Sequence, residues 1–298
     1  MNQFITAVLT SLSSGAIYAL MSISLVLVWR STRVVNFAQA GQAVFTTFIG
    51  YEVTIRTGSY WVGLFVAVIC GGLVGAIIDR FFMRPIFKRV KSGPIVMIAP
   101  VVATLGLLGL IQSVIGFIWG FNYVSIEAPV STQGYKLFGT VVAFSPFNLM
   151  VLIVVTIAML LLTLLFQKTN IGLALRASAF SPEIARLSGI KVDAVRTLGW
   201  AIAGAAGGLA GMLYVPGSYL HPNAMDVLLI FGFIAAVIGG LDSLFGAVAG
   251  AMVLGFAINF AASYVSYKLV FTTAFALLII VLLVKPNGLF SSSKGRKD

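Results

Sequence analysis

Charged residues are scarce in this sequence, and acidic residues are the scarcest of them. Of the 298 residues, 9% are charged and only 8 are aspartate or glutamate, against 19 lysines and arginines. A soluble chain of this length needs many more polar side chains to cover its surface. The lack of charge therefore excludes an ordinary soluble domain and indicates that lipid solvates much of the chain.

Residues that carry chemistry are also few. The single cysteine, Cys70, can form no intramolecular disulfide and has no neighbours at metal-ligand spacing. A Gly-x-x-x-x-Gly-Lys-Ser/Thr segment is missing, so this chain cannot hydrolyse ATP with that type of phosphate-binding loop. No nucleophile with an adjacent base and no pair of catalytic carboxylates stands out. We therefore expect neither a catalytic residue, nor a metal site, nor a cofactor in this chain.

Long apolar stretches are what the sequence does contain. Hydrophobic residues make up 60% of the chain, and the mean hydropathy is +1.07. A helix needs roughly 20 apolar residues to cross about 30 Å of hydrocarbon. Such stretches occur at 4–28, 36–55, 60–82, 95–118, 143–166 and 197–216, and the region 226–284 has room for three more. We predict an all-α, polytopic transmembrane helical bundle of about 8–9 membrane segments, formed by a single transmembrane domain over residues 1–298.

The basic residues are placed as in a membrane protein and do not form a nucleic-acid-binding patch. All lysines and arginines except Arg56, Lys136 and Lys268 lie in four short segments, 30–33, 80–91, 168–196 and 285–297. The positive-inside tendency assigns these segments to the cytoplasm. We therefore expect an external N-terminus, a cytoplasmic C-terminus, an external loop at 119–140 and a cytoplasmic turn at 239–243.

The polar stretch 167–196 contains a segment with the features of a short helix. Ser181 can cap it, Pro182 and Glu183 suit its first turn, and Gly189 can end it in the left-handed conformation. A helix of seven or eight residues is too short to be stable alone, so it needs a surface to dock against. The spacing alone leaves two interpretations open: a surface helix that caps the bundle, or a contact for a partner.

Five sequence motifs resemble the LivH-type branched-chain amino-acid ABC transporter permeases. They are VVNFAQAGQ (34–42), MRPIFKR followed by VATLGLLGLIQ (83–112), GLALRASAFSPEIARLSGIKVDAVRTLGWAIAGAAGGLAGML (172–213), AAVIGGLDSLFGAVAGAMVLGF (235–256) and KPNGLF (285–290). They occur in the family's order and cover nearly the whole chain. Ala40 stands where the family often has glycine.

The resemblance implies a subunit of an ATP-driven importer in the bacterial inner membrane. It implies a second, related permease as a heterodimeric partner, two ATP-binding cassette subunits that use ATP and Mg, and an extracytoplasmic solute-binding protein. The implied solute is a branched-chain or related small amino acid, with urea or amides as the alternative within the family. The stretch 167–196 becomes the cytoplasmic coupling loop, in which the residues that contact the ATPase are Pro182, Glu183, Ala185, Arg186, Leu187 and Gly189.

Polar residues at 36–47 give a second candidate site. Asn36, Gln39 and Gln42 recur every third residue, so their amides share one helical face, with Thr46 and Thr47 close by. Amides in hydrocarbon need partners or water. They act either as hydrogen-bonding links between helices or as part of the translocation path.

Two further patterns favour structural roles. Small-residue spacing at Gly204/Gly208, Gly207/Gly211 and Gly246/Gly250 predicts close helix packing. Glu52 precedes Arg56 by four residues, which suits a helical ion pair, and Asp79 adjoins Arg80 at the end of a predicted span.

A stand-alone secondary transporter or channel is the alternative from another mechanistic class. A proton-coupled transporter usually has an ionisable group near the membrane centre, and no strong candidate stands out. A solitary transporter also gains nothing from a docking helix, so the coupling loop separates the two hypotheses.

Overall fold

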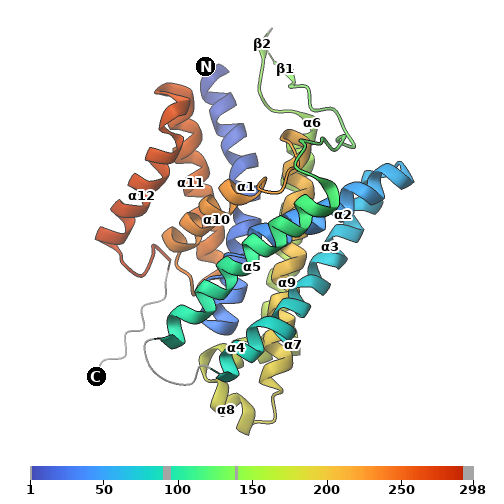
Figure 1. The fold of residues 1–298 in the computed structure, drawn as a ribbon. Helices are drawn as coiled ribbons and strands as arrows, with labels where there is room; N and C mark the ends of the chain where they lie inside the picture. Colours follow the sequence, from blue (N-terminus) through green and yellow to red (C-terminus); the bar gives the residue numbers. More distant parts are fainter. Residues whose placement is uncertain (1, 90–94, 138–139, 291–298) are drawn as a thin grey trace. The chain divides into compact units, whose positions relative to one another are not determined.

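The computed structural model describes residues 2–89, 95–137 and 140–290, and nearly all of its regular structure is helical (Figure 1). The helices are α1 (Asn2–Thr32), α2 (Gln39–Thr57), α3 (Tyr60–Ile77), α4 (Arg84–Arg89), α5 (Ile95–Trp119), α6 (Pro146–Lys168), α7 (Asn170–Phe180), α8 (Pro182–Leu187), α9 (Val192–Tyr214), α10 (Asp226–Gly239), α11 (Leu244–Tyr264) and α12 (Val270–Val284). A π-helical segment, Ile78–Met83, joins α3 to α4, and short 3₁₀ turns occupy Val215–Gly217 and Tyr267–Leu269. Two-residue strands β1 (Lys136–Leu137) and β2 (Thr140–Val141) pair antiparallel. The all-α prediction is confirmed.

Seven helical stretches within the described residues are long and apolar enough to cross a membrane. They are Gln3–Thr32, Tyr60–Arg89, Ile98–Trp119, Pro146–Lys168, Val192–Gly217, Leu244–Tyr264 and Tyr267–Val284. The predicted total of 8–9 segments is not confirmed, and α2 and α10 account for the difference. Helix α10 has 14 residues, about 21 Å of helix. Helix α2 is long enough, but it is polar and largely buried.

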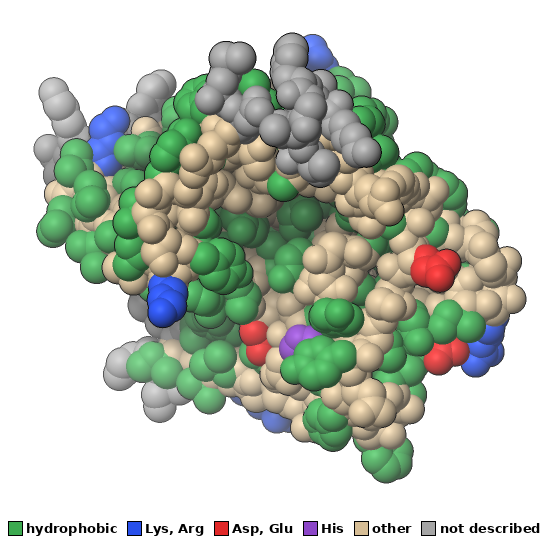
Figure 2. Space-filling view, turned by 90° about the horizontal axis from the view of Figure 1, so that it is seen from above, with side chains coloured by type: hydrophobic (Ala, Val, Ile, Leu, Met, Phe, Trp, Pro, Cys, Tyr) green, Lys and Arg blue, Asp and Glu red, His purple; other side chains and the backbone are tan. Residues whose placement is uncertain are grey.

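The outward faces of the spanning helices are apolar. Phe65 on α3, Phe117 on α5 and Leu161 on α6 are each more than 60% exposed. These faces suit contact with lipid tails. Figure 2 looks onto the end of the molecule that is uppermost in Figure 1, where hydrophobic side chains lie among uncharged groups and backbone, with a few charged side chains.

The chain divides into two compact units, one drawn from 27–129 and 156–229 and the other from 1–26, 130–155 and 230–298. In the first unit, α2, α3 and α9 pack against one another. A methyl group at Gly204 would overlap the Gly71 carbonyl oxygen of α3, and one at Gly208 would overlap the Ala67 carbonyl oxygen. The small-residue spacing on α9 therefore does serve close packing, as predicted.

In the second unit, α10 and α11 also meet through glycines. A methyl at Gly250 would overlap the Ala235 carbonyl oxygen, and one at Gly246 would overlap that of Gly239. Helix α10 ends at Gly239, Gly240 takes φ +102°, and the Ser243 hydroxyl caps α11 by accepting from the Gly246 amide. The turn predicted at 239–243 is confirmed.

Candidate functional site

The stretch 167–196, the predicted coupling loop, is more helical than the sequence suggested. Helix α6 runs to Lys168, and Thr169 starts α7 by accepting a hydrogen bond from the Gly172 amide at 3.1 Å. A methyl at Gly172 would overlap the carbonyl oxygen of Leu165, so the tight bend between α6 and α7 requires glycine. Helix α7 was not predicted, although its capping residue, Thr169, is a sequence signal that could have revealed it.

Helix α8 forms where the sequence predicts a short helix, although it has six residues instead of seven or eight. The Ser181 hydroxyl accepts from the Ile184 amide, and Pro182 lies in the first turn. Gly189 has φ +82°, a left-handed conformation that strains any residue with a Cβ. The predicted cap, first turn and terminating glycine are all found. Figure 1 shows α8 beside α7.

The predicted coupling residues of α8 divide between two faces. Ala185 points inward and is 3% exposed, whereas Leu187 is 89% exposed, and Pro182, Glu183, Arg186 and Gly189 are also exposed. The sequence analysis did not select two further apolar residues, Phe180 at 91% and Ile184 at 62% exposure. With Leu187 they give three exposed apolar side chains between the end of α7 and the end of α8, and we refer to these three as the apolar patch. The spacing of Ile184 and Leu187, one helical turn apart, is the sequence signal for it.

A chain of polar contacts connects α8 to the rest of its unit. Arg186 lies 3.6 Å from the Asp193 carboxylate at the start of α9. The Arg84 guanidinium donates to the Asp193 carbonyl oxygen and to the Thr197 hydroxyl. These contacts lead from the exposed helix to the junction of α9 with the π-helical segment that extends α3.

The carboxylate of Asp79 lies at the centre of this junction and is fully buried. It accepts from Arg196 Nε at 2.9 Å, from Arg84 Nε at 3.3 Å and from the Thr197 hydroxyl at 2.6 Å. The sequence analysis placed Asp79 beside Arg80, but the structure shows that its partners are these other two arginines. The π-helical turn changes which side chains face α9, and sequence adjacency carries no information about that.

The five polar residues of the second candidate site, Asn36, Gln39, Gln42, Thr46 and Thr47, are all fully buried. Gln39 donates to the Ala203 carbonyl of α9, and Gln42 donates to the Gly71 carbonyl of α3, each at 3.0 Å. Both amides therefore link α2 to its neighbours. The Asn36 Oδ1 and Gln42 Oε1 atoms are buried and have no hydrogen-bond partner among the residues that the structure describes. A role in the translocation path stays a prediction.

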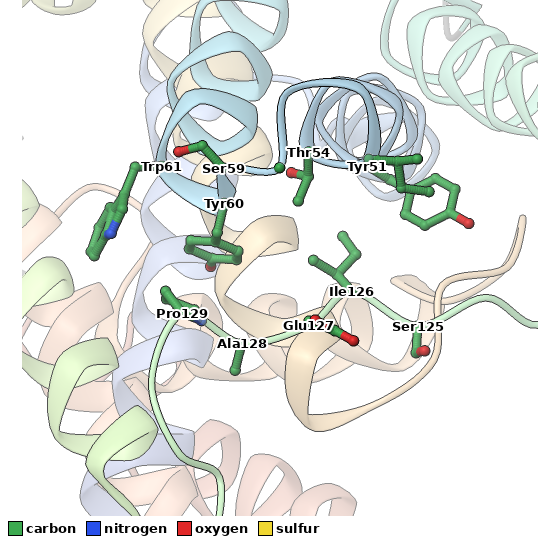
Figure 3. A pocket seen from close by; sticks show the side chains of 12 residues that line it. Tyr51, Thr54, Ser59, Tyr60, Trp61, Ser125, Ile126, Glu127, Ala128 and Pro129 are labelled. Atoms are coloured by element: carbon green, nitrogen blue, oxygen red, sulfur yellow. The ribbon is translucent and has the colours of Figure 1, made fainter.

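A cavity of about 610 Å³ lies where the turn between α2 and α3 meets residues 125–129 (Figure 3). Tyr51, Thr54 and Trp61 line one side, and Glu127 is the charged residue among those lining it. The Tyr60 hydroxyl at its base donates to the Met212 carbonyl at 2.7 Å, which fixes the start of α3 to the end of α9.

The family comparison decides what kind of protein this chain is. The model of the family described as branched-chain amino acid transport system / permease component matches residues 7–284. The chain belongs to this family. The resemblance read from the sequence motifs is thereby confirmed: the chain is a permease subunit of an ABC transporter, and it is not itself an enzyme.

Several curated relatives match this permease over nearly their whole length. The probable branched-chain amino acid transport permease LivH of Methanocaldococcus jannaschii is 30% identical over 283 residues, which is 91% of this chain and 87% of that protein. The high-affinity LivH permease of Escherichia coli is 27% identical over 305 residues, covering 99% and 97%. Among solved structures, PsaBC from Streptococcus pneumoniae in complex with Fab shares the fold, with a TM-score of 0.52, 14% identity and coverage of 96% and 93%.

Proposed function

We propose that this permease imports branched-chain or related small amino acids when partner subunits hydrolyse ATP. The names of the relatives that match almost end to end support the solute class. An autoinducer 2 import permease of Yersinia enterocolitica is 29% identical over 168 residues, but these cover only 53% of this chain. Because this match is weaker, an autoinducer-like solute is less favoured than an amino acid. Urea and amides remain the alternative solutes that the sequence motifs imply.

The exposed apolar patch on α7 and α8 is the observation that carries the coupling role. Phe180, Ile184 and Leu187 project from a segment rich in charge, and a six-residue helix cannot hold itself together in water. Exposed apolar side chains gathered in this way mark a docking surface. The proposed occupant is an ATP-binding cassette subunit, with Glu183 and Arg186 beside the patch to set its orientation.

Movement of α8 would reach the membrane through the contacts described above. Arg186 and Asp193 join α8 to α9, and the Asp79 junction holds α9 against the extension of α3. Because glycines bring the α3 and α9 backbones together without intervening side chains, the two helices would move as one body. Closure of two ATPase subunits would thus switch the permease between outward and inward access.

The family and the charge distribution support a proposal for the assembly and its orientation. A second, related permease would complete the transmembrane part, and two ATPase subunits would bind the cytoplasmic face. An external N-terminus and a cytoplasmic C-terminus place the cavity at the turn between α2 and α3 on the outside. A solute-binding protein would deliver the amino acid to that side.

Leucine uptake in proteoliposomes tests this function. The liposomes contain the chain, its partner permease, the ATPase subunits and the binding protein, with ATP supplied to the ATPase side. We expect uptake that requires both ATP and the binding protein. Leu187→Ser should reduce uptake at least about tenfold, since a buried interface anchor is commonly worth 2 kcal/mol or more. Val265→Ser removes a similarly exposed apolar side chain far along the chain and should leave uptake unchanged.

Two results would contradict the proposal. Normal uptake by the Leu187→Ser variant would remove the coupling role of α8. Uptake by the chain alone, without ATP, would identify a secondary transporter or channel. If leucine is not taken up but acetamide or urea stimulates ATP hydrolysis, the ATP-driven mechanism stands and the solute belongs to the alternative class.

A further inference from the structure

A groove of about 530 Å³ runs between the cytoplasmic extension of α3 and the first turns of α9, both in the same compact unit. At one end it is lined by Arg80, Arg84 and Lys191, with Asp193 as the acidic member. At the other end it is lined by apolar side chains, Ala76, Leu198 and Ala201. The groove is therefore charged at one end and apolar at the other.

Two of the three cations have no counter-charge within the described residues. Arg84 is engaged with the buried Asp79 carboxylate, and the Asp193 carboxylate is paired with Arg186. The side chains of Arg80 and Lys191 are exposed, and neither makes an ion pair or hydrogen bond with any residue that the structure describes. Two uncompensated positive charges that face one concave surface favour an anionic ligand.

The apolar end indicates what the anion is attached to. Ala76 and Arg84 are eight residues apart, which is roughly 12 Å of helix. Next to the groove, Leu73 and Ile77 on α3 are 59% and 48% exposed, and they continue the apolar lining away from the charges. A free phosphate would use only the basic end. A molecule with a charged head and hydrocarbon chains would cover both ends.

We propose that this groove binds an anionic phospholipid, with the phosphate against Arg80 and Lys191 and one acyl chain along Ala76, Leu73 and Ile77. Basic pockets between transmembrane helices on the cytoplasmic side commonly hold acidic headgroups. The site adjoins the Asp79 junction but uses different side chains, since Arg80 and Lys191 lie outside that network. It requires neither ATP nor a partner subunit, so it is separate from the import function.

The test is lipid retention by the purified full-length chain in detergent. Native mass spectrometry would count bound dioleoyl phosphatidylglycerol and dioleoyl phosphatidylcholine supplied at equal concentration, and thermal unfolding would be followed in the same mixtures. The test variant is R80Q/K191Q. The matched control, K168Q/R176Q, removes two exposed cations that also lack a partner among the described residues and lie outside the groove.

We expect wild type and control to retain phosphatidylglycerol in preference to phosphatidylcholine and to unfold at higher temperature with it. The R80Q/K191Q variant should lose about fivefold in affinity for each cation removed. Without lipid, its unfolding temperature should match that of wild type, because neither side chain makes an ion pair or hydrogen bond with a described residue.

Four outcomes would overturn the proposal. Equal retention of the two lipids would remove the charge preference, and equal losses in test and control variants would reduce it to a net-charge effect. If inorganic phosphate raises the unfolding temperature as much as phosphatidylglycerol does, the groove is a site for soluble anions. If wild type retains neither lipid, but R80Q/K191Q no longer copurifies with the ATPase subunits, the groove is a protein-docking surface.

Discussion

At the scale of single residues, the crossing of α3 and α9 leaves no room for a side chain at Gly204. An added methyl would overlap Gln42 Nε2 and the Gly71 carbonyl oxygen. We expect Gly204→Ala to destabilise the chain by about 1–3 kcal/mol, because backbone atoms must separate. Gly106→Ala is the control, since nothing lies within 4 Å of its added methyl on α5, and it should be neutral or slightly stabilising. Thermal unfolding in detergent measures both, and equal midpoints would refute the packing argument.

Asp79 gives a second prediction at this scale. Its carboxylate is fully buried and accepts from two arginines, so Asp79→Asn leaves both guanidinium groups without their counter-charge. We expect a loss of about 3 kcal/mol in the free energy of unfolding. Glu52→Gln breaks an exposed helical ion pair, 3.2 Å from Arg56, and should cost no more than about 0.5 kcal/mol. A similar loss in the two variants would show that burial does not decide the energy of these pairs.

At the scale of elements, α8 depends on its cap. Ser181→Ala removes the acceptor for the Ile184 amide, and N-cap loss costs about 1 kcal/mol. Backbone amides of 182–187 should exchange with deuterium roughly fivefold faster, since that energy is a fivefold change in the opening equilibrium. The unfolding temperature of the whole chain should not change. Ser188→Ala, which removes an exposed hydroxyl bond within the same helix, is the control. Unchanged exchange in Ser181→Ala would mean that contacts with α7 and α9 alone hold α8 in place.

At the scale of the whole molecule, orientation in the membrane can be measured with cysteines. Cys70→Ser gives a chain without cysteine, and Ser125→Cys and Ser188→Cys place single thiols at exposed positions. A membrane-impermeant maleimide should label Cys at 125 in intact cells and Cys at 188 only after permeabilisation, because the proposed topology places the basic segments in the cytoplasm. The opposite labelling pattern would reverse the proposed topology.

The sequence by itself determined the features that depend on local composition and order. Apolar stretches required a helical membrane protein, because backbone groups in hydrocarbon must bond within their own segment. Ser181, Pro182 and Gly189 set the limits of α8, and glycine spacing on α9 and α11 predicted close packing. The family motifs could also be recognised in the sequence, and the family match over 7–284 agrees with them.

Only the tertiary structure decided which side chains meet across distant segments. The arginine partners of Asp79 lie five residues away at the start of α4 and 117 residues away on α9, and no local pattern encodes that pairing. The partners of Gln39 and Gln42 are backbone carbonyls, which every residue carries, so the sequence could not single them out. Exposure is likewise a property of packing, and it separated the outward Leu187 from the inward Ala185 and placed the unpaired Arg80 and Lys191 in one groove.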